Sequence, residues 1–187
     1  MSKSMWKGPL GAALLLVAAA APAAAQDQGL DVTVGYQFQR VSCSDCGDAI
    51  NAPLGFSLDA AGPLLSSLWS WVGQIDWSRK SESNVTETFS SFAAGVRWSS
   101  RQPSGAVPFL QVLLGATRDK GSVDVGNTTV TTSNTNFQFE VDGGAAFPIS
   151  SDNKTSLVGL LGYRRVTQDP GLNNFRVVAG VRFNLGG

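Results

Sequence analysis

The feature that most constrains this chain is an alternation of apolar and polar residues with a period of two, which recurs along most of its length. In the stretch 175–185 every odd position is apolar, whereas the even positions include Arg176, Gly180 and Arg182. The stretch 32–39 alternates in the same way. A period of two is typical of a strand whose two faces meet different surroundings. No long segment shows a convincing helical period of 3.6, and the chain is therefore expected to be all-β.

Eight segments share this alternation, and we expect each of them to form a strand. They are 32–39, 54–62, 68–78, 86–98, 107–118, 136–148, 156–166 and 175–185. Their lengths suit the roughly 9–11 residues that a strand needs to cross a bilayer. The links near 63–67, 99–106 and 149–154 predict short turns, and the polar links at 42–53, 80–85, 119–135 and 168–173 predict loops. The alternation of short turns and longer loops predicts an eight-stranded antiparallel up-and-down barrel. The Thr- and Asn-rich part at 127–136 is expected to be a mobile loop.

The first 25 residues differ from the rest and predict a secretory signal peptide. Lys3 and Lys7 precede an apolar run at 10–21, which ends in the small residues Ala23, Ala24 and Ala25. This order of charge, apolar core and small residues is that of a peptide removed on export. An N-terminal membrane anchor over 8–25 is the alternative, because that length is close to what spans a bilayer. Cleavage after Ala25 would leave residues 26–187 as the barrel domain.

Alternation alone does not say which face of the barrel points outward, because a soluble barrel and a membrane barrel use opposite faces. The charged fraction of this chain is 15%, below the roughly 25% of soluble domains. Aromatic residues also collect at the strand ends, as they do at the two interfaces of a bilayer. One set is Trp69, Trp98, Phe147 and Phe183, and the other is Phe38, Phe56, Trp77, Phe137, Tyr163 and Phe175. These observations favour a transmembrane barrel with its apolar face toward lipid.

Charged residues on the opposite face are the main candidate site. They are Asp76, Arg97, Glu140, Asp142, Arg164, Arg176 and Arg182. If this face lines a narrow lumen, the charges of both signs can pair with one another, because an eight-stranded barrel is just wide enough for side chains to fill. We expect a structural network there, with a gate or a proton path as the alternative.

Other chemistry has little support in the sequence. The chain has no His and a formal net charge of +0, which excludes His-dependent catalysis and argues against a nucleic-acid partner. No cofactor, metal site or catalytic residue is predicted. Cys43 and Cys46 form a C-x-x-C motif, for which we expect a local disulfide in the first polar link because export leads to an oxidising compartment. Redox or zinc chemistry at the pair is the alternative.

Three segments resemble the small eight-stranded outer-membrane barrel domains of the OmpA type and the opacity proteins. They are 69–76 (WSWVGQID), 107–116 (VPFLQVLLGA) and 173–183 (NNFRVVAGVRF). The resemblance covers essentially the whole mature chain. It implies an outer-membrane location and a structural or surface-interaction role, with loops displayed at the cell surface. A narrow or gated channel is the alternative, and a soluble ligand-binding barrel or a lipid-modifying barrel enzyme is less favoured. The partners implied are outer-membrane lipid, the outer-membrane assembly machinery and an unidentified surface ligand.

Overall fold

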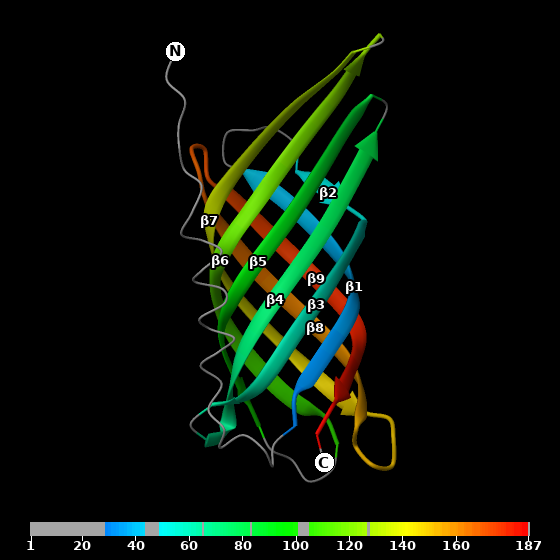
Figure 1. Ribbon diagram of the computed structural model, residues 1–187, viewed down its shortest axis with the longest axis vertical. Helices are drawn as coiled ribbons and strands as arrows, with labels where there is room; N and C mark the ends of the chain where they lie inside the picture. The colour runs from blue at the N-terminus through cyan, green and yellow to red at the C-terminus, as the bar shows by residue number, and fades with distance from the viewer. Residues whose placement is uncertain are drawn as a thin grey trace.

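One antiparallel sheet closes on itself to form a barrel (Figure 1). The computed structural model describes residues 29–43, 49–64, 66–82, 84–100, 105–126 and 128–186. Its strands are β1 (Asp31–Cys43), β2 (Ile50–Ala52), β3 (Leu54–Leu64), β4 (Ser66–Glu82), β5 (Val85–Ser99), β6 (Val107–Val125), β7 (Thr128–Pro148), β8 (Thr155–Thr167) and β9 (Leu172–Asn184). Among the described residues, no helix is long and apolar enough to cross a membrane.

Eight of these strands make the barrel wall in up-and-down order. Each barrel strand pairs with the next, and β1 closes the ring by pairing with β9 along its whole length, from Asp31↔Asn184 to Cys43↔Leu172. The short β2 pairs with β1 alone, over Gln39–Val41, beyond the last pair of β1 and β3. The predicted eight-stranded antiparallel barrel is therefore confirmed, with one short strand added at its upper end.

The prediction of a loop at 119–135, with a mobile part at 127–136, is wrong. β6 and β7 continue through this segment as a paired hairpin, in register from Val107↔Ala146 to Val125↔Thr128. Its residues carry no apolar–polar alternation because solvent surrounds both faces of the hairpin. The run is nevertheless rich in Thr, a β-branched residue that favours strands. The hairpin and the ends of β4 and β5 rise above the rest of the barrel at the top of Figure 1.

The two faces of the wall have opposite character. β8 alternates buried and exposed residues along nearly its entire length. Outward apolar side chains remain open, with Val112 38% and Leu161 66% exposed, whereas Arg176 is 2% exposed. The apolar face therefore points outward and the charged face inward, as the sequence predicts.

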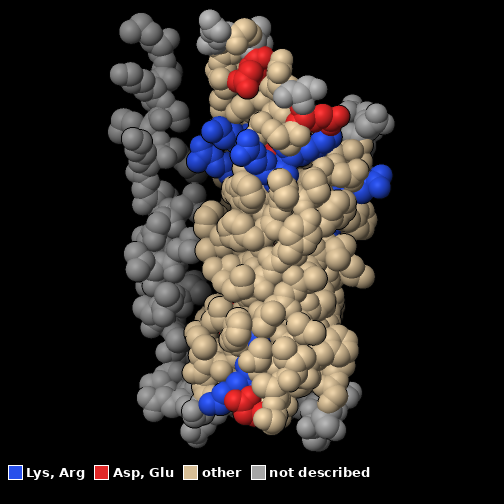
Figure 2. Space-filling model, turned by 90° about the vertical axis from the view of Figure 1, so that its right-hand side faces the viewer, with Lys and Arg blue, Asp and Glu red and all other residues tan. Residues whose placement is uncertain are grey.

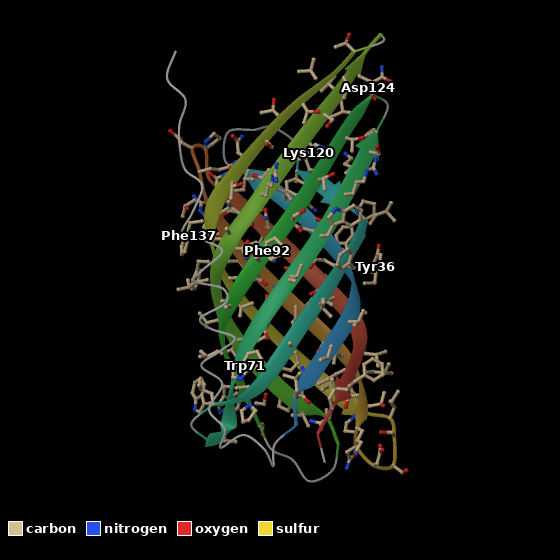
Figure 3. The ribbon with its side chains drawn as sticks, in the orientation of Figure 1. Tyr36, Trp71, Phe92, Lys120, Asp124 and Phe137 are labelled. Carbon is tan, nitrogen blue, oxygen red and sulfur yellow. The ribbon has the colours of Figure 1, made fainter. Side chains whose placement is uncertain are left out.

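Aromatic side chains gather toward both ends of the outer face. Phe56 stacks on Trp77 with ring centroids 5.9 Å apart, and the Tyr163 and Phe175 rings lie 5.3 Å apart. At the other end Trp69 is the cross-strand partner of Trp98. Tyr36 and Phe137 point away from the barrel near its upper end in Figure 3. These pairs come from the two sets of aromatic residues in the sequence.

Two further predictions concern parts of the chain that lie outside the described residues. They are residues 1–25, for which we predict a signal peptide, and the candidate disulfide of Cys43 and Cys46, where the Cys43 side chain and all of Cys46 are not described.

Candidate functional site

The lumen holds a cluster of ion pairs at whose centre lies Arg176 on β9. The Nη2 atom of Arg176 lies 2.8 Å from Oε1 of Glu140 and 2.8 Å from Oδ2 of Asp142. Its Nη1 atom lies 3.0 Å from Oδ1 of Asp76 on β4. A single guanidinium thus joins three carboxylates, two of them on β7. Such charge-assisted contacts are among the stronger hydrogen bonds in proteins.

Arg164 on β8 completes this cluster. Its Nε atom donates to Oε2 of Glu140 at 2.6 Å, and its Nη2 atom donates to Oδ2 of Asp76. Arg164, Glu140 and Asp76 are each at most 2% exposed. Because Glu140 and Asp76 each touch both arginines, no charge in the cluster is left without an opposite partner.

Glutamine side chains extend the network along the lumen. Gln74 donates to Oδ2 of Asp76 at 2.9 Å and to Oε1 of Glu140 at 3.0 Å. Gln111 donates to Oδ2 of Asp142 at 2.7 Å, and Gln37 accepts from Nη1 of Arg176 at 3.0 Å. These amides satisfy lone pairs and protons that ion pairing alone leaves over, which lowers the cost of burying the charges.

Arg97 belongs to the same network through Gln111. Its Nε atom donates to Oε1 of Gln111 at 2.8 Å, and its Nη2 atom pairs with Oδ1 of Asp59 at 2.9 Å. Its Nη1 atom is buried without a hydrogen-bond partner. Arg97 therefore links the central cluster to the lower part of the lumen.

Arg182 lies apart from the cluster, at the lower end. Its Nε atom is 3.4 Å from Oγ1 of Thr33, and its Nη1 atom is 4.0 Å from Oδ2 of Asp31. The guanidinium carbons of Arg182 and Arg97 lie 5.0 and 4.9 Å from the centre of the Phe109 ring, so one ring contacts two cations. A cavity of about 240 Å³ opens beside Arg182, with Lys154 also in its lining.

Apolar side chains share the lumen with these charges. Leu113 is 0% exposed and packs with Ala61, Val72 and Ala93. A second group on the inner face comprises Phe109, Ala146, Val158, Leu160 and Val178. Ion-paired charges and packed apolar groups therefore share the interior of the barrel. No group of acidic or Cys residues suited to a metal ion occurs within the described ranges.

The structure brings six of the seven sequence-predicted residues into one network and leaves Arg182 outside it. Sequence reasoning missed Asp59, the carboxylate partner of Arg97, and the three glutamines Gln37, Gln74 and Gln111. Each of them alternates with outward apolar residues, so the period-two pattern held the signal. Selecting isolated charges from the polar row passes over the amides, and the alternation did not by itself single out Asp59 as a partner of Arg97.

The upper end offers a different kind of surface. Above the point where β8 pairs with β7, at Phe137↔Thr167, the residues of β7 pair with β6 alone. The residues 128–135 are all exposed, and they are Thr, Val, Ser and Asn with no charge. Lys120 and Asp124 lie on this protruding part in Figure 3. We call the protruding ends of β4–β7, residues 80–82, 84–87, 120–126 and 128–136, the blade.

Comparison with solved structures finds the same barrel in several proteins. Neisserial surface protein A superposes with a TM-score of 0.68 at 16% identity, over 84% of this chain and 97% of that one. Ail, the attachment invasion locus protein of Yersinia pestis, gives 0.63 at 20% identity, over 84% and 99%. OprG of Pseudomonas aeruginosa gives 0.55 at 7% identity, over 87% and 98%. At these identities the likeness shows the fold.

A comparison with curated protein sequences gives no match. The family model described as the outer membrane protein beta-barrel domain matches residues 10–183, which is most of the chain. With the closed barrel and its apolar outer face, this match places the protein in the outer membrane. The chain belongs to the outer membrane β-barrel domain family.

Proposed function

We propose that this protein is a surface-interaction protein in which a rigid barrel anchors the blade above the outer membrane. The observation that carries the proposal is the extension of β6 and β7 beyond the barrel wall, where β7 pairs with β6 alone between Thr128 and Asn136. A strand edge of this kind presents backbone donors and acceptors to another chain. The edge has no Lys, no Pro and no charge that would repel such a partner.

The lumen supports a structural role for the barrel itself. The paired charges and the apolar group around Leu113 occupy the lumen, which favours a structural role over a channel. The chain lacks His, the commonest general base, and we propose that it acts by binding and not by catalysis. The name of Ail, an attachment protein, supports the same class of role.

The partners of the barrel follow from the same proposal. Its apolar outer face would be in contact with outer-membrane lipid, and its closed sheet would be inserted by the outer-membrane assembly machinery. We propose that export uses a signal peptide cleaved after Ala25. The blade would supply the contacts with a surface ligand.

The test compares bacteria that display the full protein with bacteria that display a shortened blade. Deleting residues 122–131 and joining Gly121 to Thr132 through an Asn-Gly turn preserves a paired position of the hairpin. Adhesion is measured on a panel of immobilised host proteins and glycans, and heat-modifiable gel migration checks that both barrels are folded. We expect adhesion with the full blade and its loss on shortening. Equal adhesion by both strains and by cells without the protein would contradict the proposal.

A further inference from the structure

Each strand that runs from the lower end of the barrel to the upper end carries one outward arginine. These ascending strands are β1, β4, β6 and β8, and the arginines are Arg40, Arg79, Arg118 and Arg165. All four are exposed. We call this set the arginine girdle.

The girdle begins where the lipid-facing surface ends. On β4, β6 and β8 the outward residues of 69–77, 108–116 and 155–163 are uncharged, and the next outward residue is the arginine. Each of these stretches has a length close to what crosses a bilayer, about 9–11 residues. Figure 2 shows Lys and Arg gathered in a band near the upper end, above a broad surface without charge. The girdle therefore lies at the level of the lipid headgroups.

The descending strands lack this feature. Along β3, β5, β7 and β9, none of the outward residues within the described ranges is charged. In the barrel order the arginine-bearing strands alternate with these strands. Adjacent strands lie about 4.8 Å apart, so neighbouring arginines are separated by about 10 Å around the wall.

The arginines of the girdle have no acidic partner on the neighbouring strands. Arg79 lies opposite Leu54 and Thr88, and Arg118 lies opposite Ser90 and Thr135. Arg165 lies opposite Phe139 and Asn173. Arg40 lies opposite Asn51 and Phe175. No ion pair within the described part of the chain involves any of the four. This differs from the arginines of the lumen, which have carboxylate neighbours.

We propose that the arginine girdle binds phosphate-bearing headgroups of the outer-leaflet lipid. A guanidinium matches the geometry of a phosphate and can donate two parallel hydrogen bonds to it. Basic residues next to a bilayer also attract anionic lipid through the surface potential. The girdle would fix the depth of the barrel and surround it with bound phosphorylated lipid. This goes beyond the proposed function, which concerns the blade.

The experiment titrates the full protein, in uncharged detergent micelles, with fluorescent lipid A that carries its phosphates or has lost them. We expect tight binding of the phosphorylated glycolipid alone, with an affinity that falls about fivefold for each arginine removed. The variant R40Q/R79Q/R118Q/R165Q would then lose the preference for phosphate. K154Q, which removes a cation from the turn at the other end, is the control and should bind as the native protein does.

Two pair variants, R40Q/R79Q and R118Q/R165Q, keep the test valid if the fourfold variant does not fold. Equal binding of the two glycolipids would overturn the proposal, and so would an unchanged preference in all the glutamine variants. Full competition by inorganic phosphate at equal concentration, or tighter arginine-dependent binding of heparin, would also overturn it by assigning the girdle to a soluble anion. The blade deletion leaves all four arginines in place, so it should bind the glycolipid normally whatever the adhesion result.

Discussion

Arg176 on β9 makes two hydrogen bonds to the carboxylate of Asp142 on β7. Its Nη2 atom donates to Oδ2 at 2.8 Å and its Nε atom donates to Oδ1 at 3.3 Å. The strand β8 lies between β7 and β9 in the wall, so the pair spans two strand spacings inside the lumen. The contact fixes strands that share no backbone hydrogen bonds.

Replacing Arg176 with Leu should destabilise the barrel strongly. The substitution leaves Asp142 without a guanidinium partner, and it leaves Asp76 and Glu140 with Arg164 alone. Removing one member of a buried ion pair costs about 3–5 kcal/mol, because the partner charge remains buried. Urea unfolding of the protein in lipid vesicles measures the change. The double variant R176L/D142L should recover part of the loss, and an R176L barrel as stable as native would show that the cluster is not buried as described.

The barrel should conduct no steady ion current in a planar bilayer. Leu113 and the paired charges are buried in its interior, so we expect no continuous water path. The variant R97A removes a side chain that is 1% exposed and links two parts of the lumen. A stepwise current that scales with the amount of native protein, and that changes in R97A, would support the channel interpretation instead.

Gly180 should tolerate no side chain. A Cβ atom there would lie 2.7 Å from the Cα atom of its cross-strand partner Gly35, and closer still to the carbonyl oxygen of Val34. Since these are backbone atoms of a closed wall, G180A should lower the yield of folded barrel. Gly159 is the matched control, because a Cβ atom there meets nothing within 4 Å. Heat-modifiable migration reports the folded fraction, and equal yields of G180A and G159A would refute this prediction.

A charge introduced on the lipid-facing surface should destabilise the barrel more strongly the deeper it lies in the bilayer. Leu161 is 66% exposed and lies on the outward row of β8. Arginine near the middle of the bilayer costs about 2–4 kcal/mol and much less near the interface. We expect L161R to unfold at lower urea concentration in vesicles, whereas T131R on the blade, opposite the uncharged Ser122, should be nearly neutral. Similar midpoints for the two variants would mean that the outer face does not contact lipid.

The sequence by itself determined the barrel, its orientation and the inward charges. The alternation around Trp71, Val112 and Val181 assigns their row to one face, and the shortage of charge on the other row argues against a solvated exterior. Both inferences depend on local pattern, because a strand has a side-chain period of two wherever it lies. They needed no knowledge of which strands are neighbours.

The tertiary structure alone decided which charges meet. Arg176 and Asp76 are separated by 100 positions in the chain, and they form an ion pair because the register of the closed sheet brings both into the same layer of the lumen. The same register kept Arg182 out of the cluster and joined Asp59 to Arg97. The Thr-rich segment near Thr132, which we expected to be a loop, is a strand because it pairs with β6. Contacts across the lumen depend on the register between strands, which a local pattern of residues does not encode.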